Sequence, residues 1–365
     1  MRAVSIEARS FRTLTEVRAE IGSGITAVVG PNASGKTNLL EAIYFALVGR
    51  SFRTRDRREL IAFGEPMARA QVEVTGDDGS AHTLLGSVSR GEGRRHLLDG
   101  SRAEPGTIAE HRPHVVVFSP DSLVLVKGPP SERRAHLDSF LAARWPGRSE
   151  LRREYGRVLA QRNALLRRIR AGLAPDTELD AWDSALVSAA VPLIAARSEA
   201  VGELTSHFAA AAAELGMGRE GKLRYAPRCG PSSEALLSGL AERRESDVQR
   251  IRTSWGPHLD ELEISIDGRS LRRYGSQGQQ RAGLLAMLFA EREALMAANS
   301  GAPLMLLDDV MSELDPRHRE LLAERLAAAG QSLITAADET SVPSAAGAHS
   351  LRMPSGLPTP LPVAA

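Results

Sequence analysis

The pattern of apolar and polar positions predicts buried strands alternating with helices at the two ends of the chain. Residues 25–29 (ITAVV) form a β-branched run, which is typical of a buried strand. The following segment has apolar residues at helical spacing, at Leu39, Leu40, Ile43, Leu47 and Val48. Residues 304–307 form another apolar run, which indicates a buried parallel strand. Together these elements predict an α/β fold.

Strand and turn signals follow the first helix. Residues 68–88 (ARAQVEVTGDDGSAHTLLGSV) predict two strands joined by an Asp-Asp-Gly turn, and residues 94–102 (RRHLLDGSR) predict a further hairpin edge. From about Ser131 to Trp255 the pattern becomes helical. Residues 149–172, 179–201, 204–215 and 232–251 each predict a helix. We therefore expect a compact helical insertion of roughly 125 residues, an ordinary size for a domain.

Composition excludes few of the possible functions. With a formal net charge of +1, the protein as a whole has no electrostatic field that would attract nucleic acid. Any nucleic-acid-binding surface would therefore be a local basic patch. The single cysteine, Cys229, can form no internal disulfide, and we interpret it as an inert residue in a reducing cytosol. The N-terminal residues lack the apolar core of a signal peptide, and we expect no membrane span. Lysine occurs only at Lys36, Lys127 and Lys222.

A phosphate-binding loop lies between the first predicted strand and helix. Its pattern is Gly-x-x-x-x-Gly-Lys-Thr, and the predicted nucleotide-contacting residues are Gly30, Pro31, Asn32, Ala33, Ser34, Gly35, Lys36 and Thr37. The N–H groups at the helix start favour an anion there. We expect Lys36 to reach the β- and γ-phosphates of ATP and Thr37 to bind Mg²⁺. Because alanine tolerates positive φ poorly, we expect Ala33 to have an ordinary backbone conformation.

Two acids end the second apolar strand. Ligands in such sheets bind beyond the carboxyl ends of the strands, so Asp308 is a predicted Mg²⁺ ligand. We expect Asp309 to orient or deprotonate the attacking water. Lys36 and Asp309 are thus the predicted catalytic residues.

A third motif has the sequence Ser-Gln-Gly-Gln-Gln. Ser276 can cap a helix that begins near Gln279, and Gly278 permits close approach of an anion. The stretch resembles the signature motif of ABC-type ATPases, which implies that it contacts the γ-phosphate of ATP bound to a second copy. The predicted contacts in this motif are Ser276, Gln277, Gly278, Gln279 and Gln280. Read alone, the motif is equally compatible with a simple polar helix cap.

Other features of the ABC pattern are altered or absent. The segment Ser312–Asp315 resembles the D-loop. No histidine occurs where a switch histidine is expected, and Thr335 or Asp338 occupies that neighbourhood. No glutamine occurs in Val115–Ser122, where a Q-loop is expected. Asp309 replaces the usual glutamate, and this shorter carboxylate predicts slow hydrolysis.

Arginines cluster after the phosphate-loop helix. Residues 50–58 contain five arginines and a single acid, Asp56. The arginines are candidate DNA-backbone contacts: Arg50, Arg53, Arg55, Arg57 and Arg58. A second basic segment, residues 148–170, carries eight arginines on a predicted helix. Phe52 and Tyr155 are the only aromatic residues among these arginines, which is not the repeated interleaving that stacks single strands, so contact with duplex backbone is the simpler interpretation. A solvated charged surface is the alternative at both places.

These stretches together resemble the RecF family, whose ATPase heads are related to SMC and Rad50 proteins. The resemblance rests on FRTL (11–14), GPNASGKTNLLEAIYFAL (30–47), GRSFRTRDRRELIAFG (49–64) and VVVFSPDSLVLVKGPPSERRAHLD (115–138). It continues in GPHLDELEISIDGRSLRRYGSQGQQR (256–281) and LLDDVMSELD (306–315). The resemblance implies an ABC-type P-loop ATPase head, with a mixed sheet flanked by helices and an inserted α-helical arm.

The resemblance also implies boundaries and a function. We expect the head in residues 1–130 and 256–353, the arm in 131–255, and a disordered tail in 354–365. The implied protein is cytoplasmic and nucleoid-associated, uses ATP and Mg²⁺, and forms an ATP-dependent homodimer on duplex or gapped DNA. Its hydrolysis is weak, and it helps RecO and RecR to load RecA at single-stranded gaps. The alternatives are a nucleotide-gated scaffold without DNA binding, a transporter-type ATP subunit, and a metabolic P-loop kinase.

Overall fold

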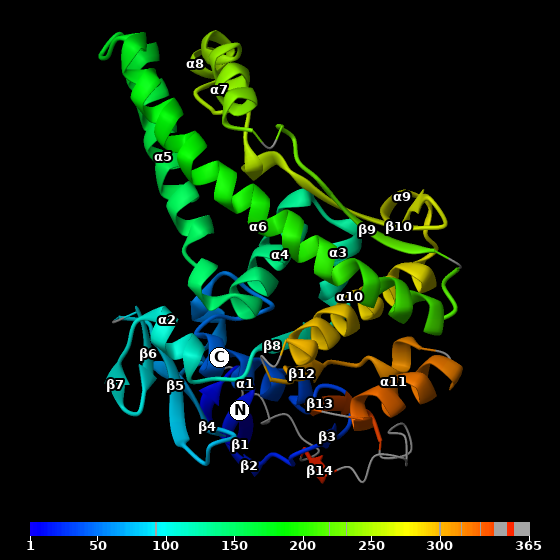
Figure 1. Cartoon of the computed structure of the whole chain (residues 1–365). Helices are drawn as coiled ribbons and strands as arrows, with labels where there is room; N and C mark the ends of the chain where they lie inside the picture. Colours follow the sequence, from blue (N-terminus) through cyan, green and yellow to red (C-terminus); the bar gives the residue numbers. More distant parts are fainter. Residues whose placement is uncertain are drawn as a thin grey trace, which may run out of the picture. The chain divides into compact units, whose positions relative to one another are not determined.

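The chain forms two compact units in the computed structural model, which describes residues 1–91, 93–218, 220–230, 232–298, 301–314, 316–328, 330–338 and 349–353 (Figure 1). Unit 1 comprises Met1–Ser122 and Asn299–Ala365, and unit 2 comprises Leu123–Ala298. Unit 2 includes the expected arm, 131–255, and extends beyond it at both ends to include the Ser276 motif. The expected tail, 354–365, lies outside the described residues.

Unit 1 contains a five-stranded parallel sheet. Its order is β14 (His349–Arg352), β3 (Ile25–Val29), β13 (Gln331–Ala336), β12 (Leu304–Leu307), β8 (Val115–Phe118), with every neighbouring pair parallel. All residues of β3, β12 and β13 are buried, as expected for parallel strands covered on both faces. The two strands predicted from apolar runs are confirmed.

A six-stranded antiparallel sheet forms the second layer of unit 1. Its order is β2 (Leu14–Glu20), β1 (Arg2–Phe11), β4 (Met67–Thr75), β5 (Ala81–Ser89), β6 (Gly93–Leu98), β7 (Ser101–Arg102). Both predicted hairpins are confirmed. In β4, buried and outward-facing side chains alternate, because successive side chains of a strand point to opposite faces.

Helix α1 (Lys36–Val48) lies in the core of unit 1, where it contacts β1, β4, β5 and β13. Its residues from Leu39 to Leu47 are all buried, which explains its nearly continuous apolar sequence. Gln331 joins the two sheets, because its buried amide accepts from the Ala3 N–H and donates to the Ala3 carbonyl. The other elements of unit 1 are α2 (Pro105–Glu110), α11 (Pro316–Ala328) and 3-10 turns at Arg57–Leu60, Pro120–Leu123 and Met311–Glu313.

Unit 2 is mostly helical. Its helices are α3 (Val124–Lys127), α4 (Pro130–Arg144), α5 (Leu151–Arg170), α6 (Leu179–Glu214), α7 (Ser233–Ala241), α8 (Arg244–Arg250), α9 (Leu271–Tyr274) and α10 (Gln277–Ala297). Short 3-10 turns occur at Pro146–Arg148, Asp176–Glu178 and Pro257–Leu259. Long helices α5 and α6 pack against each other, and α6 also contacts α4, α7, α10 and β9. The apolar face predicted for α5 is confirmed by buried Tyr155, Val158, Leu165 and Leu166.

Three predictions for this unit are wrong. The segment 232–251, expected as one helix, forms two, α7 and α8, which are separated at Glu242 and Arg243. The helices expected at 179–201 and 204–215 are one continuous helix, α6, because buried Val201, Leu204 and Phe208 carry its apolar face past Gly202. The arm is also not wholly helical. Residues Gly221–Ala226 form β9, which pairs with β10 (Glu261–Ile266), and β10 pairs with β11 (Arg269–Ser270). The partner of β9 lies about 40 residues along the chain, so local pattern could not identify the pair.

Helix α6 is long and apolar enough to cross a membrane by length and composition alone. Its buried side chains include Asp183 and Arg197, and both are paired within unit 2. Arg197 forms a two-pronged contact with Asp138 at 2.8 and 2.9 Å. Since α6 packs on four other helices and a strand, we interpret it as the core helix of this unit.

Candidate functional site

The phosphate loop connects β3 to α1 and has a tightly folded backbone. A side chain at Gly30 would lie 2.8 Å from Ser34 Oγ, and Gly35 has a left-handed φ of 95°. Ala33 also has a positive φ, of 65°. The expectation of an ordinary conformation at Ala33 is therefore wrong, since the geometry of the loop overrides the preference of alanine.

Lys36 folds over the loop that precedes it. Its ammonium donates to the carbonyl of Gly30 at 2.7 Å and to that of Pro31 at 2.9 Å. Ser34 Oγ is buried, and it has no hydrogen-bond partner in the described part of the chain. A buried polar atom without a partner is costly, so the loop holds both a cation and an unsatisfied hydroxyl where phosphate oxygens would lie.

Asp308 joins the phosphate loop to the neighbouring strands. It follows β12, and its two carboxylate oxygens each lie 2.9 Å from the hydroxyl of Thr37. Thr335, at the end of β13, donates to Asp308 Oδ1 at 2.9 Å. Burial raises the pKa of Asp308, while the hydrogen bonds from Thr37 and Thr335 oppose that shift. Because β3, β13 and β12 are parallel neighbours, Thr37, Thr335 and Asp308 lie together near the C-terminal ends of these strands.

Asp309 differs from Asp308 in its surroundings. Its side chain is exposed, its φ is 51°, and its N–H donates to the hydroxyl of Thr335 at 2.7 Å. Thr335 therefore contacts both acids. Asp338 is exposed and follows β13 by two residues. Of the two candidates for the position of the missing histidine, Thr335 is the one that contacts the strand-end acids.

The donor set fits ATP and Mg²⁺. A hydroxyl and a carboxylate already lie within 2.9 Å of each other at Thr37 and Asp308, which are oxygen ligands of the kind Mg²⁺ takes beside substrate phosphates. The buried Ser34 hydroxyl and the Lys36 ammonium suit the phosphates themselves. No cluster of three or more His, Cys, Asp or Glu side chains suited to a metal occurs among the described residues.

The Ser276 motif lies in unit 2, at the start of α10. Ser276 Oγ accepts from the Gln279 N–H, and the Gln279 side chain accepts from the Ser276 N–H, so the two residues form a capping box. The predicted cap is confirmed, and the helix begins two residues earlier than expected. The side chains from Ser276 to Gln279 are exposed, whereas Gln280 is buried and donates to the Leu271 carbonyl.

The predicted DNA-contacting arginines differ in how they are held. Arg53 donates to Asn38 Oδ1 at 3.0 Å and to Glu41 Oε2 at 3.1 Å, both on α1. Arg50 Nε lies 3.3 Å from the hydroxyl of Tyr44, also on α1. The side chains of all five are exposed: Arg50, Arg53, Arg55, Arg57 and Arg58. The loop is thus attached to the helix that starts at the phosphate loop.

Two further arginines lie close to this loop, and Arg94 donates to the Gly49 carbonyl. Burial lowers the pKa of Arg94, and nearby Arg57 lowers it further. Burial likewise lowers the pKa of Arg112, and Arg50 adds to that shift. The sequence did not single out Arg94 and Arg112 because they are far from the loop along the chain.

The basic face predicted for α5 is only partly present. Arg162 is completely buried and donates to Asp183 at 2.7 Å and to Asp247 at 2.9 Å. Arg148, Arg152 and Arg168 each form an ion pair with an acid from another segment. The eight arginines therefore do not form one free cationic face, because neighbouring elements supply acids that the linear count did not include.

Sequence reasoning missed a buried acid beside the site. Glu41, on α1, is fully buried and binds Arg12 at 2.9 Å as well as Arg53. Asn38 donates to Thr13 at 2.7 Å. A glutamate inside an otherwise apolar helix was the available signal, since a buried carboxylate requires partners. Glu41 thereby connects the FRTL segment, the arginine loop and the phosphate-loop helix.

Two other segments of the site are partly described. Ser312 donates to the Asp309 carbonyl at 2.9 Å, while Asp315, the last residue of the predicted D-loop, lies outside the described residues. Where a Q-loop was expected, β8 ends at Phe118, whose carbonyl accepts from the Asp308 N–H at 2.8 Å. Ser119 follows and lies 3.0 Å from the hydroxyl of Ser122.

Comparison with known proteins gives consistent matches over most of the chain. The family model described as the RecF/RecN/SMC N terminal domain matches residues 3–356. The DNA replication and repair protein RecF of Anaeromyxobacter sp. (strain Fw109-5) is 38% identical over 358 residues, covering 95% of both chains. The protein of the same name from Heliobacterium modesticaldum is 36% identical over 334 residues, covering 89% of both.

Solved structures agree with these matches. One described as the recombination mediator protein RecF-ATP in the RecFOR pathway has a TM-score of 0.86 and 28% identity, covering 93% of each chain. The Smc head domain of Pyrococcus furiosus has a TM-score of 0.56 and 18% identity, covering 93% of this chain and 90% of that one. The second likeness concerns the fold alone.

Proposed function

Because this chain belongs to the RecF family of ABC-type ATPase heads, we propose that it is an ATP-gated DNA-binding protein of recombinational repair. In this proposal ATP closes two copies into a dimer, and the dimer holds duplex or gapped DNA. The protein helps RecO and RecR to load RecA at single-stranded gaps, in the cytoplasm and at the nucleoid. The observation that carries the ATP part is the contact of Thr37 and Thr335 with Asp308 beside the Lys36 loop.

The roles of the nucleotide-site residues follow from their contacts. Residues Gly30 to Thr37 surround the phosphates, and the Lys36 ammonium exchanges its loop carbonyls for the β- and γ-phosphates. Thr37 and Asp308 hold Mg²⁺, which neutralises phosphate charge when bound. Thr335 keeps the Asp308 carboxylate oriented through its 2.9 Å hydrogen bond.

Hydrolysis is slow in this proposal. Asp309 is the exposed acid next to the metal ligand, and it orients or deprotonates water. An aspartate is one methylene shorter than a glutamate, so its carboxylate holds the water farther from the phosphate. Such a weak ATPase acts as a switch, whose ATP state persists long enough for DNA to bind.

The dimer depends on the exposed start of α10. Ser276 to Gln279 are exposed at the start of this helix, and a helix N-terminus suits an anion. The family resemblance implies that the anion is the γ-phosphate held by the second copy. One chain then contains two half-sites and needs a partner copy to complete either of them.

Support for DNA binding comes from the arginine loop. Arg57 and Arg58 are exposed, and Arg94 and Arg112 lie near enough to the loop for mutual repulsion to affect their pKa values. Arg53 connects the loop to Glu41 and Asn38 on α1. Because α1 begins at Lys36, a change of nucleotide can reach the loop through this single helix.

The dimer is tested by measuring molar mass. We expect the wild-type chain to double its mass by light scattering with ATP and to remain monomeric with ADP. Ser276→Arg should bind ATP with unchanged affinity and remain monomeric, because a bulky cation fills the motif. Ser188→Arg, at another exposed serine of unit 2, is the matched control. A Ser276→Arg chain that still dimerises with ATP would contradict the proposal.

A further inference from the structure

The small sheet of unit 2 has one apolar and one charged face. In β9, Leu223 is buried, whereas Lys222 and Arg224 are exposed. In β10, buried Leu262 and exposed Glu263 follow the same alternation. Helix α6 packs on β9, so the apolar face is covered by that helix. The other face carries charged side chains that the core of unit 2 does not use.

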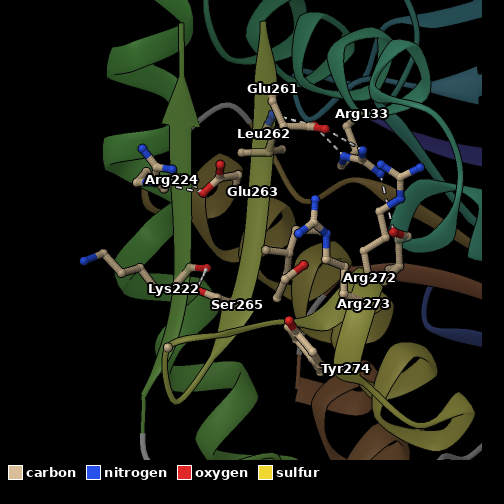
Figure 2. A pocket seen from close by; sticks show the side chains of 14 residues that line it. Arg133, Lys222, Arg224, Glu261, Leu262, Glu263, Ser265, Arg272, Arg273 and Tyr274 are labelled. Atoms are coloured by element: carbon tan, nitrogen blue, oxygen red, sulfur yellow. Dashed lines mark hydrogen bonds and ion pairs between the residues drawn. The ribbon is translucent and has the colours of Figure 1, made fainter.

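A pocket lies on this charged face (Figure 2). Its volume is about 600 Å³, which is within the range of small-ligand sites. Strands β9, β10 and β11 and helices α3, α4 and α9 contribute to its lining. Its cationic side chains are Arg133, Lys222, Arg224, Arg272 and Arg273, and its acidic side chains are Glu261 and Glu263. The cations of the pocket therefore outnumber its acids.

Both acids of the pocket are already paired with a cation of the pocket. Glu261 receives a two-pronged contact from Arg133 at 2.7 and 2.8 Å. Glu263 accepts from Arg224 Nε at 2.9 Å. These two pairs neutralise their own charges, so the net positive charge of the pocket comes from its other three cations.

Those three cations have no acidic partner. Arg272 donates to a carbonyl, that of Lys127, at 3.2 Å. For the side chains of Lys222 and Arg273, no hydrogen bond or ion pair occurs within the described ranges. All three side chains are exposed, and they come from two elements that are distant in sequence, β9 and α9. A ligand with several adjacent phosphates matches such a group of cations, because ammonium and guanidinium groups both bind phosphate oxygens.

An exposed aromatic ring lies beside these cations. Tyr274 is 70% exposed. It directly follows Arg273, and Figure 2 shows it in the same pocket as Arg273 and Lys222. A flat aromatic ring can stack on any nucleobase, since every base has a π-face. The pocket thus offers a place for phosphates and a surface for a base within one small volume.

Helix α9, which carries the ring and two of the cations, is firmly attached to α10. The Gln280 amide donates to the Leu271 carbonyl at 3.2 Å. Leu271 is buried, and a side chain at Gly283 would lie 2.2 Å from its Cδ2 atom. A side chain at Gly275 would lie 2.6 Å from the Leu271 carbonyl oxygen. The binding groups of α9 are therefore held in place before a ligand arrives, which lowers the entropic cost of binding.

We propose that this pocket binds a nucleoside polyphosphate, at a second nucleotide site separate from the phosphate loop. The phosphates contact Lys222, Arg272 and Arg273, and the base stacks on Tyr274. Inorganic polyphosphate would use the same cations, but it leaves the exposed ring without a role. The inference goes beyond the proposed function, and none of its residues belongs to the proposed ATP site.

The test measures ATP binding to the full-length Lys36→Ala chain by isothermal titration. We expect this chain to bind one molecule of ATP, where the wild type binds two. In the same background, Arg273→Ala should weaken binding at least about tenfold, as the loss of one charge-assisted contact predicts. Tyr274→Ala should weaken it at least about fivefold, whereas Tyr274→Phe keeps the ring and should not. Arg157→Ala, at an exposed arginine of α5, is the control.

Inorganic tripolyphosphate separates the phosphate contacts from the base contact. Arg273→Ala should weaken its binding as it weakens ATP binding, whereas Tyr274→Ala should leave it unchanged because no base is present. Two results would overturn the proposal. One is a Lys36→Ala chain that binds no ATP, and the other is residual ATP binding that neither Arg273→Ala nor Tyr274→Ala weakens, which would belong to the phosphate loop.

Amide hydrogen exchange locates the bound nucleotide. Saturating the Lys36→Ala chain with ATP should slow exchange in residues 221–226 and 266–276, and Arg273→Ala should abolish this protection. Protection confined to residues 30–37 would contradict the assignment. If ATP fails to dimerise the wild type but protects 266–276, this inference stands and the proposed gate fails. If ATP dimerises the wild type but does not protect 266–276, the reverse holds.

Discussion

The hydroxyl of Thr335 donates to Asp308 Oδ1 at 2.9 Å and accepts from the Asp309 N–H at 2.7 Å. One side chain from β13 thus contacts both acids that end β12. The parallel register of the two strands makes this possible. Leu307 of β12 lies opposite Ile334 of β13, so the next residues along the two strands, Asp308 and Thr335, are neighbours. Thr335 is a positioning residue, because it acts through the two acids.

Replacing Thr335 tests this positioning role. Thr335→Val keeps the shape but removes the hydroxyl, so Asp308 loses a donor and the Asp309 N–H loses its acceptor. We expect the free energy of unfolding to fall by about 1–3 kcal/mol and single-turnover ATP hydrolysis to slow at saturating ATP. Thr335→Ser should restore both. Urea unfolding and a single-turnover assay measure them, and identical behaviour of the valine and serine variants would refute the role.

Lys36 should not be replaceable by arginine, although arginine is abundant elsewhere in the chain. The lysine ammonium reaches two loop carbonyls within 2.9 Å, and a planar guanidinium does not fit the same space. We expect Lys36→Arg to weaken ATP binding at least about tenfold, equal to about 1.4 kcal/mol, by isothermal titration. Lys127→Arg, at an exposed lysine, is the control. Unchanged ATP affinity in Lys36→Arg would contradict the proposed phosphate contact.

Arg162 should be essential for the stability of unit 2. It is fully buried and shares its guanidinium between Asp183 and Asp247, with Thr253 as a third acceptor at 2.9 Å. Arg162→Met leaves the buried Asp247 carboxylate without its cation, while Asp183 keeps its ion pair with Arg244. We therefore expect a loss of about 3–5 kcal/mol in the free energy of unfolding.

The control lies on the same helix. Arg157→Met replaces an exposed arginine of α5 and should change the free energy of unfolding by no more than about 0.5 kcal/mol. Equal destabilisation by the two substitutions, measured by urea unfolding, would show that the buried network contributes nothing specific.

The pair of His136 and Glu291 predicts a pH dependence. Burial lowers the pKa of His136, but the neighbouring Glu291 carboxylate raises it by more, so the net shift is upward. The stabilisation is then fully present below the unfolded-state pKa of about 6.5 and is lost as the pH rises through the higher folded-state pKa. His136→Gln should destabilise the protein most at low pH. A difference from wild type that stays constant from about pH 6 to 9 would exclude this linkage.

The nucleotide site could be predicted from the sequence because its signals are local. A strand, a glycine-rich loop and a helix start follow one another from Ile25 to Val48, and Asp308 ends a continuous apolar run. The expected strands, the helix and the Ser276 cap are all present. Each depends on residues within a few positions of one another, where pattern and capping chemistry decide the structure.

What could not be predicted depends on residues distant in sequence. Strand β9 forms because β10, about 40 residues later, supplies its hydrogen bonds. Arg162 belongs to the predicted basic segment, but Asp183 and Asp247, which are distant in sequence, pair with it in the core. Ala33 takes a positive φ because its loop must turn tightly between β3 and α1. In each case tertiary contacts outweigh local preference.

The central claim is that ATP gates DNA binding, and the anisotropy of a labelled duplex tests it most directly. Binding is measured with ATP, with ADP and without nucleotide, each over a series of salt concentrations. The account predicts binding only with ATP, weakening steeply with salt because phosphate contacts release counterions. Arg57→Glu and Arg58→Glu should weaken this binding, whereas Arg157→Glu should not. Equal binding, or none, in all three nucleotide states would contradict the account.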